Sequence, residues 1–170
     1  VMSGLVHDPH VSQYRLTAHL SAAVIIYAYM FWTALDLWFA GDGYSGGGGT
    51  HAQRRFALFV TAFIFLTLLS GGFVAGLKAG FSYNTFPKMG DTWVAPGILV
   101  LEPVWRNLFE NAATVQFNHR ILAITTLLLV LALWVGSIGK ALAPRARLGL
   151  HLLLLAALAQ VTLGITTLLL

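Results

Sequence analysis

The amino-acid sequence predicts an all-α integral membrane protein with four spanning helices. Of its 170 residues, 58% are hydrophobic and only 9% are charged, whereas a soluble globular domain carries roughly 25% charged residues. Asp, Glu, Lys and Arg do not occur in residues 16–35, 56–77, 121–139 and 148–170. Because about 20 apolar residues cross a bilayer as a helix, we expect spans at about residues 16–40, 56–77, 115–138 and 148–170.

The first two spans are joined by the Gly-rich stretch GDGYSGGGGTHAQRR, a composition that predicts a flexible connector. We do not interpret it as a phosphate-binding loop, because no strand precedes it and Arg54 and Arg55 lead directly into the second span. That span ends among glycines, where Gly72 and Gly76 share one helix face. Small residues at this spacing predict the close approach of a neighbouring helix.

The long connection at residues 78–114 carries Tyr83, Trp93 and Trp105, which are typical of a membrane interface. Its prolines break it into short pieces, and we expect residues 102–113 to form an amphipathic interfacial helix.

The stretch GKALAPRAR predicts a short turn between the third and fourth spans. Small and polar groups at mid-membrane depth favour helix–helix contact, and in the fourth span these are Gln160, Thr162, Gly164 and Thr166.

The basic residues predict the orientation in the membrane. The two short connections hold five basic residues and one acid, whereas the N-terminal flank and the long loop together hold four of each. Since Lys and Arg in short loops mark the cytoplasmic side, we expect residues 78–114 on the non-cytoplasmic side and the short connections in the cytoplasm or mitochondrial matrix. The Lys and Arg residues behind the net charge of +4 lie beside or between the spans, and they form no basic run interleaved with aromatics. We therefore expect the chain to contact the lipid bilayer and not nucleic acid.

The six histidines differ in their settings. His7 and His10 are separated by Pro9 in a polar flank, and we interpret them as solvated. His51 falls in the Gly-rich connector and His151 at the start of the fourth span, where both are expected to be interfacial. The chain contains no cysteine, which excludes disulfides and Cys-ligated zinc or iron–sulfur clusters.

His19 and His119 each lie just inside a span on the long-loop side, so we expect them at similar depth, with Arg15 one turn before His19 and Arg120 directly after His119. Ionisable groups inside a membrane usually mark function, and a neutral imidazole is an axial ligand for haem iron. From position alone three arrangements stay open. Each ring could bond a neighbouring helix, each could ligate a haem, or the two could clamp one haem between them.

Three sequence words resemble the haem A synthase family: VSQYRLTAHL around His19, GGFVAGLKAGFSYNTFPKMGDTW after the second span, and VQFNHRIL around His119. The similarity extends through QVTLGITTLLL at the end of the chain. It implies a protein of eight spanning helices in two similar four-helix halves, which oxidises a methyl group of haem O to the formyl group of haem A. Residues 1–53 then correspond to the end of the N-terminal half and residues 54–170 to part of the C-terminal half.

The resemblance also implies a role for each histidine. His19 matches an axial ligand of the substrate haem O, and His119 matches an axial ligand of a haem b cofactor, so the two serve different haem irons. The other ligand of each haem, and the catalytic residue, belong to family helices with no match here. The chain starts at Val1 without an initiator Met and ends in an apolar run, so we expect a truncated protein that is inactive in isolation.

Arg15, Lys88 and Arg120 are candidates to neutralise haem propionates, against a role as plain interface anchors. The resemblance implies a bacterial plasma membrane or mitochondrial inner membrane, with haem O synthase and cytochrome oxidase assembly factors as candidate partners. The main alternative is a b-type cytochrome-like electron carrier that does not modify haem. A transporter is disfavoured, because the sequence shows no matched interrupted spans.

Overall fold

The structure is a computed structural model that describes residues 12–40 and 48–170. These residues contain four helices long and apolar enough to cross a membrane, which confirms the predicted all-α membrane fold. They are α1 (Gln13–Phe39), α2 (His51–Gly76), α4 (Ala112–Val135) and α5 (Pro144–Leu169). Short 3-10 turns η1 (Ala79–Phe81) and η2 (Val104–Arg106) and the single-turn α3 (Asn107–Glu110) lie in the long loop between α2 and α4.

The start of α2 is fixed by a capping box, in which two residues satisfy each other's free backbone donors. The Thr50 side chain accepts a hydrogen bond from the Gln53 backbone N–H at 3.2 Å, and the Gln53 side chain accepts from the Thr50 N–H at 2.9 Å. Such a box stabilises a helix N-terminus. His51 is therefore the first residue of α2, and its assignment to the connector was wrong. His7 and His10 lie outside the described residues.

The continuous helix expected over residues 102–113 was also wrong. Asn111 has an extended backbone (φ −92°, ψ 112°) that separates α3 from α4. Its side-chain oxygen accepts a hydrogen bond from the Thr114 backbone N–H at 3.2 Å, so it caps α4. Asparagine is favoured at the residue before a helix, where its side-chain oxygen accepts a hydrogen bond from a free backbone N–H of the first turn. For this reason α4 starts at Ala112.

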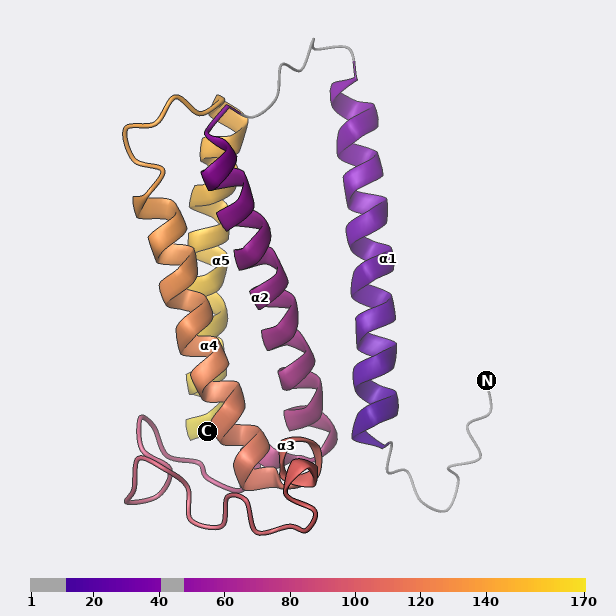
Figure 1. The fold of residues 1–170 in the computed structure, drawn as a ribbon, viewed down its shortest axis with the longest axis vertical. Coiled ribbons are helices and arrows are strands. Elements are labelled where there is room, and N and C mark those ends of the chain that lie inside the picture. The colour runs from indigo at the N-terminus through magenta and orange to yellow at the C-terminus, as the bar shows by residue number, and fades with distance from the viewer. Residues whose placement is uncertain (1–11, 41–47) are drawn as a thin grey trace.

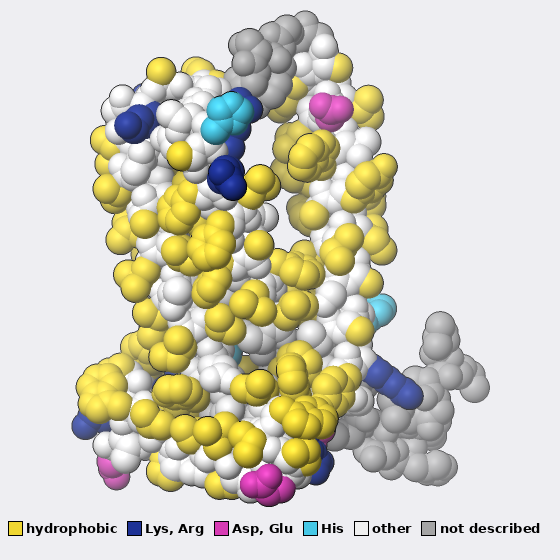
Figure 2. All heavy atoms as spheres, in the orientation of Figure 1, with side chains coloured by type: hydrophobic (Ala, Val, Ile, Leu, Met, Phe, Trp, Pro, Cys, Tyr) yellow, Lys and Arg dark blue, Asp and Glu magenta, His cyan; other side chains and the backbone are white. Residues whose placement is uncertain are grey.

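Helix α2 lies between α1 and α4 and packs against both, while α5 packs against α4 (Figure 1). The fully buried apolar contact joins Val60 of α2 to Val130 and Leu133 of α4. On the face shown in Figure 2, hydrophobic side chains cover much of the surface, and the basic residues lie toward the two ends. Trp38, for example, is 83% exposed. Such a surface suits lipid or further helices and not water.

The predicted close helix approach is confirmed at the α1–α2 contact. A Cβ atom placed on Gly76 would lie 2.5 Å from the Gln13 Cα, and one on Gly72 would lie 2.7 Å from the Thr17 hydroxyl oxygen. Neither separation leaves room for a methyl group. Glycine at these two positions therefore lets α1 lie directly on the α2 backbone.

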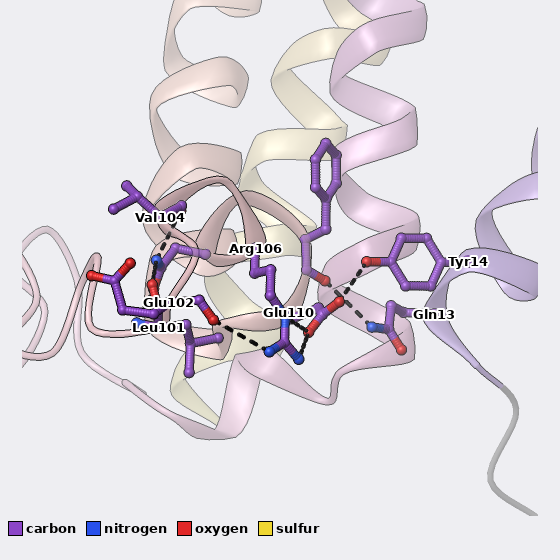
Figure 3. Close-up of polar contacts among 9 residues, drawn as sticks. Gln13, Tyr14, Leu101, Glu102, Val104, Arg106 and Glu110 are labelled. Carbon is purple, nitrogen blue, oxygen red and sulfur yellow. Dashed lines mark hydrogen bonds and ion pairs between the residues drawn. The ribbon is translucent and has the colours of Figure 1, made fainter.

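The first turn of α1 is tied to the long loop (Figure 3). The Tyr14 hydroxyl donates to a Glu110 carboxylate oxygen at 3.1 Å, and the Arg106 Nε donates to the other oxygen of the same carboxylate at 2.8 Å. The Tyr14 ring also meets the Phe73 ring edge-on, with centroids 5.6 Å apart. One end of the helix bundle is thus closed by contacts among α1, α2 and the loop.

The opposite end holds the described residues 48–50, before α2, and residues 136–143, between α4 and α5. Gly48, before α2, forms an isolated antiparallel bridge with Leu142, before α5. The Arg145 guanidinium carbon lies 3.9 Å from the centroid of the Phe39 ring, within the range of a cation–π interaction. Residues 48–50 and 136–143 therefore share one end of the molecule.

The small and polar groups of α5 have no helix partner within the described chain. Gln160, Thr162, Gly164 and Thr166 are all exposed, and a Cβ built on Gly164 would meet no described atom within 4 Å apart from its chain neighbours and the backbone of α5 itself. The threonine hydroxyls donate to carbonyls of α5 itself, such as that of Leu158 at 2.9 Å. The helix–helix contact expected on this face is thus not formed within the described residues.

Candidate ligand site between α2 and α4

His119 lies on α4 and packs half-buried against α2. Its Nδ1 is 2.7 Å from the Ser70 hydroxyl oxygen. The ring edge rests on the next residue of α2, since a Cβ built on Gly71 would lie 3.2 Å from the His119 Cε1. Ser70 and Gly71 together fix the position of the imidazole, one by a hydrogen bond and one by leaving space.

The other ring nitrogen is unengaged. His119 Nε2 has no hydrogen-bond partner among the described residues. In this part of the chain the fully buried side-chain atoms without a partner are Thr17 Oγ1, Gln116 Oε1 and Arg120 Nε. Nε2 is not one of them, so it can be reached from outside the described chain. An imidazole held through Nδ1 with Nε2 accessible fits an axial ligand of haem iron.

A second polar contact joins the same two helices. The Thr67 and Thr126 hydroxyl oxygens are 2.6 Å apart. Thr67 lies one turn before Ser70 on α2, and Thr126 lies two turns after His119 on α4. We call these four residues the α2–α4 polar seam. Its two contacts join α4 to α2, and the contact at Ser70 alone reaches the His119 ring.

His19 has a different setting. It lies on α1 and is exposed, as is Arg15 one turn earlier, and no hydrogen bond joins the His19 ring to a described residue. Because α2 separates α1 from α4 (Figure 1), the structure does not bring His19 and His119 together. This arrangement of the helices gives no support to a clamp of the two histidines around one haem.

Arg120 reaches the long loop. Its Nη1 donates to the Lys88 carbonyl at 3.0 Å and its Nη2 to the Tyr83 carbonyl at 2.9 Å. The Gln116 side chain donates to the same Tyr83 carbonyl at 2.8 Å. Arg120 and Gln116 thus hold residues 83–88 against α4, and Lys88 is exposed beside them.

His151 is exposed near the start of α5, which agrees with its expected interfacial place. The Trp134 indole N–H donates to its Nδ1 at 2.9 Å. In the described part of the chain no three His, Asp or Glu side chains gather to hold a bare metal ion.

Sequence reasoning missed Ser70 and Gln116. Ser70 precedes two glycines in a run that predicted helix packing alone, and 49 positions separate it from His119. Gln116 lies one turn before Arg120, on the same face of α4. This spacing predicts that the two side chains could contact the same group. The group is the backbone carbonyl of Tyr83 in the long loop, and a backbone carbonyl cannot be recognised from the sequence.

The fold is an integral membrane helix bundle in which His119 of α4 is held against α2 by Ser70. Residues 1–170 match the family COX15-CtaA, described as cytochrome oxidase assembly protein. The chain belongs to this family, which confirms the resemblance seen in the sequence.

Individual relatives agree along the whole chain. It is 51% identical over 170 residues to "Heme A synthase" of Nitrosospira multiformis, covering all of this chain and 48% of the relative. It is 47% identical to "Heme A synthase" of Nitrosomonas eutropha, again over all of this chain and 48% of the relative. "Heme A synthase COX15" of Homo sapiens is 44% identical over 96% of this chain and 40% of its own length. The chain thus spans about half the length of these relatives or less. No solved structure matches it.

Proposed function

We propose that this chain is part of a haem A synthase, an oxidoreductase that converts a methyl group of haem O to the formyl group of haem A. The observation that carries the proposal is the alignment of the whole chain with proteins named for this activity, at 51% identity in the Nitrosospira relative. The activity belongs to a protein about twice as long, and the 170-residue chain alone is expected to be inactive.

His119 is the proposed axial ligand of haem b, through Nε2. Three features support this: the ring is anchored through Nδ1, Nε2 is accessible, and apolar helices surround the site. Bound haem supplies redox chemistry, while the chain supplies ligation, orientation and an apolar setting. The second ligand would come from a segment of the relatives beyond the half that aligns here.

His19 is the proposed ligand of the substrate, haem O. His19 is exposed on α1 and has no hydrogen bond to a described residue, which suits a haem bound by α1 and further helices. Residues 1–53 would then complete an N-terminal half and residues 54–170 a C-terminal half. The catalytic residue is expected outside this chain, in the helix that supplies the other ligand for haem O.

Basic residues at the long-loop end would offset the propionate charges. Arg15 and Lys88 are exposed, so both are available to a carboxylate. Arg120 already donates from both Nη atoms to the loop, so its proposed effect is to place Lys88 and add positive potential. This end would face the non-cytoplasmic side of a bacterial plasma or mitochondrial inner membrane, where haem O synthase and cytochrome oxidase assembly factors are the proposed partners.

The test uses a chimera in which residues 1–170 replace the matching segment of the Nitrosospira multiformis relative, called here the full-length chimera. We expect His119→Ala to abolish the haem b absorbance of the purified chimera and the haem A extracted from cells. His151→Gln, at a histidine bonded to Trp134, is the matched control and should change neither.

Each alternative has its own outcome. Haem bound at His119 without any haem A in the cells would indicate an electron carrier. An unchanged haem content in His119→Ala would remove haem ligation from the proposal.

A further inference from the structure

We infer that Ser70 is a positioning residue for His119: its hydroxyl accepts a hydrogen bond from Nδ1–H and so holds the imidazole in the tautomer whose Nε2 lone pair is free for iron. The hydrogen bond follows from the structure of this chain. Its role toward iron rests on the proposed function.

The direction of the hydrogen bond follows from counting protons. The Ser70 hydroxyl oxygen is 2.7 Å from the Thr67 carbonyl oxygen and 2.7 Å from the His119 Nδ1. A carbonyl oxygen only accepts, so the single hydroxyl proton serves that contact. The second contact is then a hydrogen bond only if Nδ1 carries a proton and donates it. No other assignment satisfies both contacts.

The neighbouring pair in the α2–α4 polar seam follows the same rule. The Thr67 hydroxyl donates to the Phe63 carbonyl at 3.0 Å, so it accepts from Thr126. Both α2 hydroxyls thus donate their proton to a carbonyl of α2 itself, and each accepts a hydrogen bond from α4. The backbone of α2 therefore fixes the direction of both contacts.

His151 shows that this tautomer is not common to the histidines of the chain. An indole N–H can only donate, so the Trp134 contact makes Nδ1 of neutral His151 an acceptor and puts its proton on Nε2. The two rings are held in opposite tautomers. Of the two, only His119 keeps its Nε2 lone pair for a metal.

A hydrogen bond from the outer N–H of a ligating histidine fixes the ring orientation and makes the ligand more basic. Ser70 provides such a bond within a membrane-spanning helix pair, with no carboxylate needed. A more basic ligand favours ferric over ferrous iron. Loss of the bond should therefore weaken haem binding and raise the reduction potential.

The first experiment needs no haem. The 170-residue chain, labelled with 15N-histidine in lipid bilayers, gives the tautomer of each ring by solid-state NMR, and His119→Gln identifies the signal. We expect a protonated Nδ1 and an unprotonated Nε2 at His119, and a shift toward protonated Nε2 in Ser70→Ala. A protonated Nε2 in the wild type, or no change in Ser70→Ala, would overturn the inference.

The second experiment measures the effect on iron in the full-length chimera. Removing such an outer partner typically costs about 10–100-fold in metal affinity, so Ser70→Ala should lose haem to that extent and shift the midpoint potential upward. Ser70→Thr, which keeps the hydroxyl, should restore both. Thr126→Val breaks the other contact of the seam without touching His119, and it should leave the potential unchanged.

The two experiments separate the possible failures. An equal loss in Thr126→Val and Ser70→Ala would mean that Ser70 acts only through helix packing, which overturns the inference. A chimera that binds no haem through His119, although Nδ1 is protonated, would refute the proposed function and with it the role toward iron. Bound haem with the opposite tautomer would refute the Ser70 inference alone.

Discussion

Glu110 connects the long loop to α1 through its carboxylate. The hydrogen bond from Arg106 holds the pKa of this carboxyl below its usual range, and the bond from Tyr14 acts in the same direction, while desolvation opposes them. A carboxyl with a lowered pKa in the folded state contributes stability above its unfolded-state pKa. That contribution disappears as the pH falls through the folded-state pKa.

This linkage predicts an acid-dependent loss of stability at one residue. The melting temperature of the wild-type chain in detergent should fall on acidification below the usual range of a glutamate pKa, more steeply than that of Glu110→Gln. Glu102→Gln is the control, because Glu102 forms no salt bridge in the described structure. Parallel curves for the wild type and Glu110→Gln would show that the contact adds nothing to stability.

Helix α2 packs against α1 on one face and against α4 on another, and different kinds of residue form the two contacts. Gly72 and Gly76 face α1, Gly71 accommodates the His119 ring, and the hydroxyls of Thr67 and Ser70 face α4. Within a membrane, helices associate through such close packing and polar contacts, because lipid is as apolar as the helix surface. The glycines therefore decide how near α1 lies.

Replacing Gly76 with alanine tests this packing. The new methyl group would meet the Gln13 backbone, so we expect destabilisation by about 1–3 kcal/mol, as for other overpacked contacts. Gly149→Ala in α5 is the matched control, since a Cβ there would meet no described atom within 4 Å apart from its chain neighbours and the backbone of α5 itself. It should be neutral or stabilising by up to about 1 kcal/mol. Detergent-titration unfolding curves measure both, and equal effects would contradict close packing at Gly76.

For the whole molecule, the two ends differ in charge and in structure. One end holds the short basic connections, joined by the bridge between Gly48 and Leu142. The other holds the long loop, fixed by Arg120 and Gln116. This asymmetry predicts a single orientation in the membrane, with the basic end in the cytoplasm.

These 170 residues contain no cysteine, so a single introduced cysteine reports the orientation once any cysteine in the rest of the chimera has been replaced. We expect a membrane-impermeant maleimide to label Asp91→Cys of the full-length chimera in bacterial spheroplasts, since that residue lies in the long loop. Ala141→Cys, in a short connection, should react only after the membrane is permeabilised. The opposite pattern of labelling would reverse the proposed orientation.

The sequence alone determined the four spans, the short connections and the family, because lipid demands long apolar helices and because whole sequence words are shared with relatives. It also singled out His119 and the glycines facing α1. Helix starts were less accurate, since the caps at Thr50 and Asn111 depend on backbone geometry that hydrophobicity does not encode.

Only the tertiary structure decided what each of these residues contacts. Ser70 meets His119 across 49 positions, and Arg120 binds loop carbonyls that any residue would supply. The separation of His19 from His119 likewise follows from α2 lying between their helices. A sequence records which side chains exist, but the pairing of hydrogen-bond donors and acceptors depends on how the helices rotate and pack.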